Sequence, residues 1–445
     1  MKRTRIISVL VPVLALLSIL LAACGSGSLG NEEIAFVRDG NIWTVNPSGA
    51  SPFEAVAQST PVLGYGLSPD HQIFVFRVLD GDFSKTPAAR HLTANPVTGL
   101  VGDVPGALNT IGIDGGTPIP LTLSTPNLAR SNAWWTPDGN RLLYREGALS
   151  TLASPDLVSW WMAQNDQPAG IARKFLPNSY SIPSIDTGSQ HVLGNSSQGV
   201  FTTTLAGSHF TFVQHSALTG HPLPASLERL LWQPAHQNPS VLLALPLATA
   251  QESGSEEVRL ILWQPDGQMR TLANCACRQF AWSPDGNQVL YNTNQDYTVL
   301  NIQDGTSFRF IAEHGAVPYW SPHSRALLLD GLHTLTLVQI AARQVQVLLN
   351  DDNAPVLTDG PLPGNVAFLQ PVANSLWNVD GQRFVIATRG RMHWQGQLLR
   401  TGDGLYVVNL NNQGVPQGTP VLVDKNSHDT QPGWSYINPN TSFLF

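Results

Sequence analysis

Short apolar runs, rich in β-branched and aromatic residues, recur along the chain and are separated by turns of Gly, Pro, Asn and Asp. The clearest pair, residues 278–282 and 287–291, is joined by Ser-Pro-Asp-Gly at 283–286. Proline presets the second turn position, Asp tolerates the third, and Gly takes the left-handed one. Two such runs around a short Gly-containing turn predict a β-hairpin. Residues 199–205 and 209–213 predict another.

The hairpin motif recurs in degenerate copies along most of the chain. Its full form is Trp-Ser-Pro-Asp-Gly at 282–286, and the clearest relative is Trp-Thr-Pro-Asp-Gly at 135–139. Weaker copies begin at Leu67, Ser184, Trp232, Trp320, Trp377 and Trp434. Successive copies start 68, 49, 48, 50, 38, 57 and 57 residues apart. A period near fifty, with several short strands in each unit, is typical of β-propeller blades.

The turn, the apolar strand after it and a second strand ending in Asn-Pro-Ser-Gly resemble the TolB-like, WD40-like (PD40) β-propeller repeat. Residues 34–49 match the second half of that repeat. The resemblance extends over nearly all of residues 31–445 and implies an all-β fold, a single propeller of four-stranded blades. It says little about function, because such propellers serve many unrelated tasks.

Counting the copies predicts eight blades, or seven if the unit at 184 merges with a neighbour. The N-terminal strands lack a Trp-Ser-Pro-Asp start of their own. We therefore expect the C-terminal strand, within residues 434–445, to complete the N-terminal blade and to remove the exposed sheet edges.

The repeat residues themselves are predicted to be structural. An aromatic side chain just before a turn most often packs between neighbouring blades, so we interpret the tryptophans as packing residues and not as ligand contacts. The residues assigned this role are Trp135, Pro137, Asp138, Gly139, Trp282, Pro284, Asp285, Gly286, Trp320, Trp377 and Trp434.

The first thirty residues predict a lipid anchor. Basic residues precede an apolar stretch at 6–21, which is shorter than the roughly twenty residues that a membrane-spanning helix needs. Residues 1–23 are therefore predicted to be a signal peptide. Leu21, Ala22 and Ala23 before Cys24 resemble a bacterial lipobox, which implies that the Cys24 thiol accepts a lipid; the alternative is an ordinary signal peptide followed by a coincidental cysteine. Residues 24–30 then form a Gly/Ser tether.

This anchor places the domain at 31–445 outside the cytoplasm, on the cell membrane or on an outer membrane if the host has one. The net charge is −7, and it becomes −10 once residues 1–23 remove Lys2, Arg3 and Arg5. An acidic domain disfavours nucleic acid as a partner. We expect a monomer.

Two further cysteines, Cys275 and Cys277, share one face of a predicted strand. A disulfide is permitted outside the cytoplasm, although two residues at this separation strain it. The alternatives are a local disulfide, two free thiols or a redox site. Four oxygen-bearing residues suit Ca²⁺ chemically but lack the spacing of a calcium loop, so we expect no metal and no other cofactor. They are Asp351, Asp352, Asn353 and Asp359.

Catalytic motifs are missing from the sequence: it contains no nucleophile elbow, P-loop or dinucleotide-binding signature. The resemblance to TolB-like propellers implies an interaction scaffold for an envelope protein or cell-wall partner. The alternative is an enzyme that processes a small molecule or carbohydrate in the central channel, where each blade contributes only one or two residues. A cluster of carboxylates and histidine at one mouth of the channel would favour this alternative. We assign no catalytic residue and expect binding; the long insertion at 81–106 is the candidate binding loop.

Overall fold

The structure is a computed structural model. It describes residues 33–49, 52–70, 72–92, 101–113, 115–149, 159–164, 172–176, 184–186, 188–196, 199–214, 230–234, 239–246, 258–264, 267–275, 277, 280–293, 296–351, 368–370, 376–378, 380–389, 391–399, 404–425 and 430–434. In these ranges the regular elements are strands and two short 3₁₀ helices, η1 (Phe83–Lys85) and η2 (Ala88–His91). No helix in the described part of the chain is long and apolar enough to cross a membrane.

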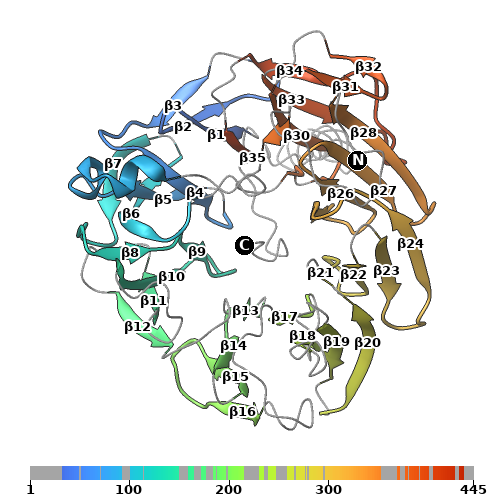
Figure 1. Ribbon diagram of the computed structural model, residues 1–445, viewed down its shortest axis with the longest axis horizontal. Helices are drawn as coiled ribbons and strands as arrows, with labels where there is room; N and C mark the ends of the chain where they lie inside the picture. The colour runs from blue at the N-terminus through green and yellow to red at the C-terminus, as the bar shows by residue number, and fades with distance from the viewer. Residues whose placement is uncertain are drawn as a thin grey trace, which may run out of the picture.

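The strands of these residues form seven antiparallel sheets that follow one another around a central axis (Figure 1). Each four-stranded sheet extends from an inner strand near the axis to an outer strand at the rim. Along the chain, the outer strand of one sheet leads to the inner strand of the next. This radial arrangement is that of an all-β propeller.

The first sheet brings together the two ends of the described chain. It contains β3 (Phe53–Val56), β2 (Asn41–Val45), β1 (Ile34–Arg38) and β35 (Thr430–Trp434). β35 pairs antiparallel with β1 and takes the innermost place. Figure 1 shows this meeting of the blue and red ends of the chain. The residues after 434, which belong to the segment expected to complete this sheet, lie outside the described ranges.

The second sheet has nine strands. They are β4 (Val62–Leu67), β5 (Ile73–Leu79), β6 (Val104–Gly112), β7 (Gly115–Pro120), β8 (Leu128–Arg130), β9 (Trp134–Trp135), β10 (Arg141–Ala148), β11 (Ser159–Gln164) and β12 (Arg173–Leu176). β8 pairs with both β6 and β10. It thereby joins two sets of four strands, β4–β7 and β9–β12, into one sheet.

Three sheets of four strands follow. They contain β13 (Ser184–Ile185), β14 (His191–Ser196), β15 (Gly199–Thr204) and β16 (Thr211–Gln214); β17 (Leu230–Trp232), β18 (Val241–Pro246), β19 (Val258–Trp263) and β20 (Met269–Cys275); and β21 (Phe280–Trp282), β22 (Gln288–Thr293), β23 (Asp296–Asn301) and β24 (Ser307–Ile311). Both hairpins predicted from the apolar runs are present, β21–β22 and β15–β16. The degenerate copy at 184 also begins a sheet of its own.

The last two sheets are interlocked. One contains β25 (Val317–Trp320), β26 (Ala326–Asp330), β27 (Thr334–Gln339), β28 (Gln344–Asp351), β31 (Met392–Trp394) and β32 (Gln397–Leu398), and the other β29 (Phe368–Gln370), β30 (Arg383–Arg389), β33 (Gly404–Asn409) and β34 (Val421–Asp424). The β31–β32 hairpin belongs to the connection from β30 to β33, yet β31 pairs with β28 of the preceding sheet. The β31–β32 hairpin therefore covers part of the outer edge that β28 would otherwise expose.

The Ser-Pro-Asp-Gly turns close through their own side chains. Ser283 Oγ donates to Asp285 Oδ1 (2.5 Å) and accepts from the backbone N–H of Gln288 (2.9 Å). Gly286 has a φ of 69°, in the left-handed region that favours glycine. Burial acts to raise the pKa of Asp285, but hydrogen bonds, including that of Ser283, outweigh burial and hold this pKa below its ordinary value.

The tryptophans before these turns lie between neighbouring sheets or, for Trp135, between the two sets of strands of the second sheet. Trp377 Nε1 donates to the carbonyl of Tyr319 (2.8 Å), and Trp282 Nε1 to the carbonyl of Leu231 (3.3 Å). Each acceptor belongs to the inner strand of the preceding sheet. Trp135 and Trp320 are buried in apolar clusters with residues of the strands that precede them. The core therefore consists of separate apolar clusters, and the buried repeat tryptophans belong to four of them.

The turns between first and second strands are bonded to one another at one end of the ring, which we call the turn end. The backbone N–H of Asp285 donates to Ser324 Oγ (3.1 Å), and that of Asp138 to Ser189 Oγ (2.9 Å). Both serines occupy the glycine position of their own turns, with φ of 57° and 52°. Their hydroxyl groups thus link consecutive turns.

Replacing Ser324 with alanine is expected to lower the free energy of unfolding by about 1 kcal/mol, the usual net contribution of one hydrogen bond. Alanine keeps the left-handed backbone but cannot accept from the N–H of Asp285. Chemical denaturation measures the difference. Ser307→Ala, at an exposed position on β24, is the control and is expected to change little. Equal effects of the two substitutions would contradict the proposed link between turns.

Candidate functional site

The two ends of the ring are built differently. Because the strands are antiparallel, the connections from second to third strand and from one sheet to the next lie opposite the turn end. We call this other side the connection end. It carries the long insertion between β5 and β6, the two neighbouring cysteines, and a cluster of buried carboxyl and imidazole groups.

The insertion between β5 and β6 folds back onto the ring. The sequence predicted it at 81–106, but β6 already begins at Val104, so the strand includes its last residues. Phe83 of η1 is buried in a small apolar cluster with Leu63 and Leu79 of the strands beneath. Residues 93–100 lie outside the described ranges.

Asp80 fixes the start of the insertion. Its Oδ1 accepts hydrogen bonds from the backbone N–H groups of Asp82 (3.0 Å) and Phe83 (2.8 Å). Its Oδ2 accepts from Ser124 Oγ (2.5 Å). Burial would raise the pKa of Asp80, but these hydrogen bonds outweigh it and hold the pKa below its ordinary value. Asp80 therefore stays ionised and organises the first turn of the insertion.

Arg77 fixes the return of the insertion to the ring. Its guanidinium is 1% exposed and donates to the carbonyls of Gly102 (3.0 Å) and Val101 (2.6 Å), and also to that of Arg130. Burial lowers the pKa of Arg77 to about 10, and the negative charge of Asp103 opposes this effect. A buried cation is costly unless its donors are satisfied, and the returning segment supplies two of the three acceptors.

Two ion pairs complete the attachment of the insertion to the ring. Arg145 Nη2 contacts Asp103 Oδ2 (2.5 Å), and Arg130 Nε contacts Glu146 Oε2 (2.6 Å). Between its two attachment points the insertion presents polar and small side chains to solvent. The exposed residues are Gly81, Asp82, Lys85, Pro87, Ala88, Arg90 and His91. The insertion is thus a loop with a buried polar anchor and an exposed tip.

A second cluster of charged groups lies at the connection end between β24 and β28. Glu313, in the connection from β24 to β25, is 2% exposed, and its carboxylate faces the tight turn between β26 and β27. Its hydrogen-bond donors are the backbone N–H groups of Leu332 (3.0 Å), His333 (3.0 Å) and Thr334 (2.8 Å) and the Thr334 hydroxyl (2.8 Å). Burial raises the pKa of Glu313, while the bonds from Thr334 and His333 act in the opposite direction.

His333 and Asp351 form a buried pair beside Glu313. His333 Nδ1 lies 2.7 Å from Asp351 Oδ2, and the two side chains are 1% and 0% exposed. Within the described ranges His333 Nε2 has no hydrogen-bond partner. Asp351 thereby fixes the orientation of the imidazole ring.

Asp330 and Tyr319 differ from these groups because their polar atoms lack partners. Each residue is 8% exposed, and neither side chain has a hydrogen bond or ion pair with any residue in the described ranges. Burial and the charge of Glu313 raise the pKa of Asp330 well above its ordinary value. Burial and the neighbouring Asp330 do the same for the pKa of Tyr319. Burial thus favours the neutral forms of both groups.

Asparagine at position 330 is expected to flatten the pH dependence of stability. With a raised pKa, folded Asp330 holds its proton more tightly than the unfolded chain. The stability that proton binding by Asp330 adds to the folded protein is therefore fully present below the ordinary pKa of 3.8. It is lost as pH rises through the raised pKa. Urea denaturation from about pH 4 to about pH 8 should show a smaller fall in unfolding free energy for Asp330→Asn. An unchanged fall would contradict this assignment.

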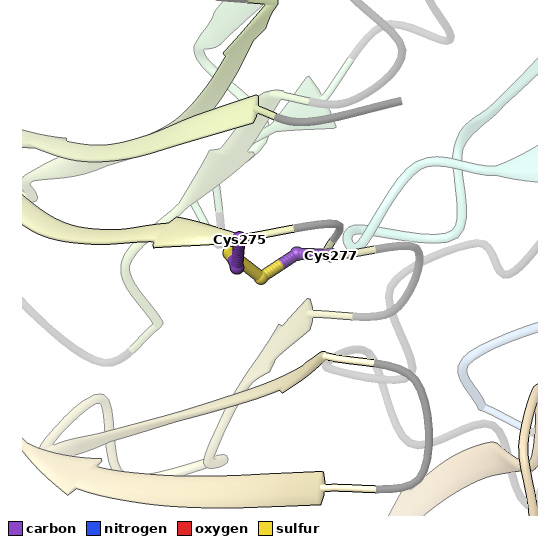
Figure 2. Close-up of a disulfide and its surroundings, with 2 residues drawn as sticks. All are labelled: Cys275 and Cys277. Atoms are coloured by element: carbon purple, nitrogen blue, oxygen red, sulfur yellow. A yellow bond between two sulfur atoms is a disulfide. The ribbon is translucent and has the colours of Figure 1, made fainter. Parts of the chain in front are cut away.

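The cysteines at the connection end are joined. Cys275, at the end of β20, and Cys277 form a disulfide with a Cα–Cα distance of 5.0 Å (Figure 2). Both residues are buried. Of the alternatives left open by the sequence, the structure has the local disulfide.

The remaining predicted site residues are dispersed. Cys24 and the lipobox Leu21, Ala22 and Ala23 lie outside the described ranges, as do Asp352, Asn353 and Asp359 of the possible calcium group. Asp351, the only member of that group in the described residues, is bonded to His333. No group of three or more His, Cys, Asp or Glu residues in those ranges has the arrangement to hold a metal ion.

The turn end has a polar hollow with a volume of 260 Å³ between the last two sheets. His323, Arg325 and Asp380 are among its lining residues, and all three are exposed. Exposed polar groups are hydrated without a ligand, so none of these three side chains requires one. The connection end is the stronger candidate.

None of the protein-family models and none of the curated proteins compared with the chain matches it. Solved structures with a similar fold include TolB from Acinetobacter baumannii, with 12% identity, coverage of 71% of this chain and 77% of that chain, and a TM-score of 0.37. They also include an oligogalacturonate lyase from Vibrio parahaemolyticus, with 10% identity, coverage of 86% and 98%, and a TM-score of 0.47. A eukaryotic initiation factor shares 12% identity, with coverage of 92% and 99% and a TM-score of 0.48. These low similarities favour no function.

Proposed function

We propose that this chain is a lipid-anchored β-propeller that binds an envelope protein or a cell-wall partner through its connection end. The observation that carries the proposal is the difference between the two ends. At the turn end, short turns bond to one another. At the connection end, the insertion is held at its base by buried Arg77 and Asp80 and keeps its tip exposed. Exposed loops fixed on a rigid scaffold are where binding residues concentrate.

The proposal includes a ring of eight four-stranded blades, closed by β1 and β35. Support comes from the two sets of four strands joined by β8, the separate sheet that begins at Ser184, and the pairing of β35 with β1. Such a ring keeps the inner edges of its sheets short and protected around the axis and presents its loops on two opposite faces. It is a monomer, and its acidic charge disfavours nucleic acid as a partner.

The proposed anchor is a lipid on Cys24, followed by the Gly/Ser tether at 24–30. The Cys275–Cys277 disulfide supports a location outside the cytoplasm, where such bonds persist. Cys24→Ala is expected to release the protein from the membrane fraction of its host, because the lipid is then missing. An unchanged distribution between membrane and soluble fractions would contradict lipid anchoring.

Affinity capture from chemically crosslinked cells tests the binding function. The first variant replaces Lys85, Arg90 and His91 of the insertion tip with alanine. Its control replaces His323, Arg325 and Arg343, which are exposed at the turn end and carry the same charges. One envelope component should be captured by the parent protein and by the control, and at least about tenfold less by the tip variant, as expected when interface residues are truncated. Equal capture by both variants would remove the insertion from the binding face.

Small-molecule binding or processing is a second candidate function. It is favoured by the cluster at the connection end, where burial raises the pKa values of Glu313 and Asp330 beside the buried pair of His333 and Asp351. Ionisable groups with perturbed pKa values concentrate at functional sites. No catalytic residue is assigned to it.

A further inference from the structure

The polar hollow at the turn end is formed where four turns of the last two sheets meet. Two of these turns join first and second strands, and two join third and fourth strands. The first two are packed together, since a Cβ atom on Gly381 would lie only 3.3 Å from Pro322 Cδ. The other two are joined by Gln339 Nε2, which donates to the carbonyl of Gly414 (3.0 Å). Contacts between its own walls therefore hold the hollow in shape.

One residue of the lining carries a buried hydroxyl group whose hydrogen has no acceptor. Ser321 is 3% exposed, and its Oγ accepts from the backbone N–H groups of Arg325 (3.2 Å) and Ala326 (3.0 Å). Within the described ranges the Ser321 hydroxyl donates to no group. Leaving a buried donor unused is unfavourable, so an acceptor that enters the hollow would gain a hydrogen bond at no cost to the protein.

The other turns of the ring explain why this hydroxyl is unused. In three of them the hydroxyl at the same position donates to the aspartate two residues later; the donors are Ser68, Thr136 and Ser283. His323 takes the place of that aspartate beside the hollow. In the described part of the chain, the side chains of Ser321 and His323 are not bonded to each other. The missing carboxylate thus leaves the donor of Ser321 available.

The other side chains of the hollow supply both donors and acceptors. Asn411 Oδ1 accepts from the backbone N–H groups of Gln413 and Val415 (2.9 Å each), whereas its Nδ2 group bonds to no described residue. Asp380 Oδ1 accepts from the backbone N–H of Gln382 (2.7 Å), and its Oδ2 bonds to none of the described residues. An amide donor and a carboxylate acceptor therefore lie in the lining with the Ser321 hydroxyl.

The chemistry and the size of the hollow together indicate its ligand. Arg325 and Asp380 carry opposite charges, so the two charges select neither an anion nor a cation. A hydroxyl group can donate and accept at once, which matches a lining that offers both. The volume of 260 Å³ is just below the roughly 300–1,000 Å³ of pockets for drug-sized ligands, and it suits a single ring. Ala326 and Leu410 add apolar surface for its C–H groups.

We propose that the hollow binds one neutral sugar ring, whose hydroxyl groups bond to the Ser321 O–H, to Asn411 Nδ2 and to Asp380 Oδ2. The ring is either a free sugar or the terminal residue of a glycan, because both present the same hydroxyl groups. The inference does not rest on partner binding by the insertion, and it requires no cofactor and no covalent step.

NMR titration of the purified full-length protein, kept in a detergent without sugar groups, tests the proposal. The probes are the methyl glycosides of glucose, galactose, mannose and N-acetylglucosamine. At least one should bind saturably, and no saturable binding of any of them below roughly 50 mM, where ligands of millimolar affinity saturate, would overturn the inference. A disaccharide ending in the same residue then distinguishes the sources: retained binding assigns the hollow to a glycan end, and lost binding assigns it to a free sugar.

His323→Asp tests the role of the Ser321 hydroxyl without changing Ser321. The new carboxylate should accept the hydroxyl within the turn, as Asp285 does for Ser283, and sugar binding should weaken roughly two- to tenfold, the effect of one lost hydrogen bond. His323→Ala is the matched control, because it removes the imidazole without supplying an acceptor, and it should bind like the parent. Equal affinities of the two variants would show that the hydroxyl does not contact the ligand.

Two further measurements check the ligand class and the separation from the capture experiment. Phosphate binding more tightly than every sugar would show that the hollow selects an anion and would contradict a neutral ligand. The variant lacking Lys85, Arg90 and His91 of the insertion tip should bind the sugar like the parent, because the insertion is at the opposite end of the ring. The two proposals therefore fail separately.

Discussion

Replacing Arg77 with methionine is expected to detach the insertion from the ring and to lower the free energy of unfolding by roughly 3 kcal/mol or more. Methionine fills much of the same volume but leaves the buried carbonyl of Arg130 and the partly buried carbonyls of Val101 and Gly102 without their donor. The insertion should then open far more often than the rest of the ring. Chemical denaturation measures the loss, and limited proteolysis within 81–103 measures the opening.

Lys85→Met is the control for this prediction. It also removes one positive charge, but the Lys85 side chain is 76% exposed and its Nζ pairs with the equally exposed Asp82. An exposed pair of this kind contributes about 0–1 kcal/mol. Cleavage of the Arg77 variant at the rate of the Lys85 variant would show that the returning segment is held by other contacts.

Alanine at Trp377 is expected to destabilise the protein by about 3–5 kcal/mol, the usual cost of truncating a buried large aromatic side chain. Trp377 is 1% exposed and packs edge-on against Phe384, with ring centroids 5.4 Å apart. Its Nε1–H also donates to the carbonyl of Tyr319 in the preceding sheet. The substitution therefore removes packing and a bond between sheets together.

Phenylalanine at the same position separates the two contributions. It keeps most of the aromatic packing and removes the bond to Tyr319, so it should cost about 1–3 kcal/mol. Denaturation curves of the two variants provide the comparison. If Trp377→Phe destabilised the protein as much as Trp377→Ala, packing against the neighbouring sheet would not be the larger contribution.

The local parts of this fold could be predicted from the sequence because short-range chemistry determines them. The turn at 283–286 needs proline, aspartate and glycine in that order, and its flanking strands follow. Even the copy that begins at Ser184, with no tryptophan and no proline, keeps the same hydrogen bonds: Asp186 accepts from the backbone N–H groups of Gln190 and His191. The spacing of the copies located it.

Pairings between distant strands could not be predicted in this way. β8 joins two sets of strands, and β31 crosses to the edge of the preceding sheet. Neither strand has a sequence motif, because their partners are set by the approach of two sheets in space. The same holds for the carboxyl cluster, since Glu313 and His333 come from two connections and Asp351 from the end of β28, and they meet only in the folded ring.

A weaker signal for the site was nevertheless present. Arg77 and Asp330 are charged residues within or at the end of otherwise apolar strands, at 73–79 and 326–330. Arg and Asp are almost never fully buried unless paired, so a charge in a strand predicted to be buried marks a position that needs a partner. This pattern identifies both clusters of the connection end without identifying their ligands.

The binding function is tested most directly by photo-crosslinking from defined positions in living cells. A photoreactive amino acid replaces Ala88, exposed on the insertion, or Asn140, exposed in a turn at the opposite end. Irradiation followed by mass spectrometry identifies what each position contacts. The proposal predicts one reproducible envelope component crosslinked from Ala88 and absent from Asn140. The same component captured from both positions, or from Asn140 alone, would contradict recognition through the connection end.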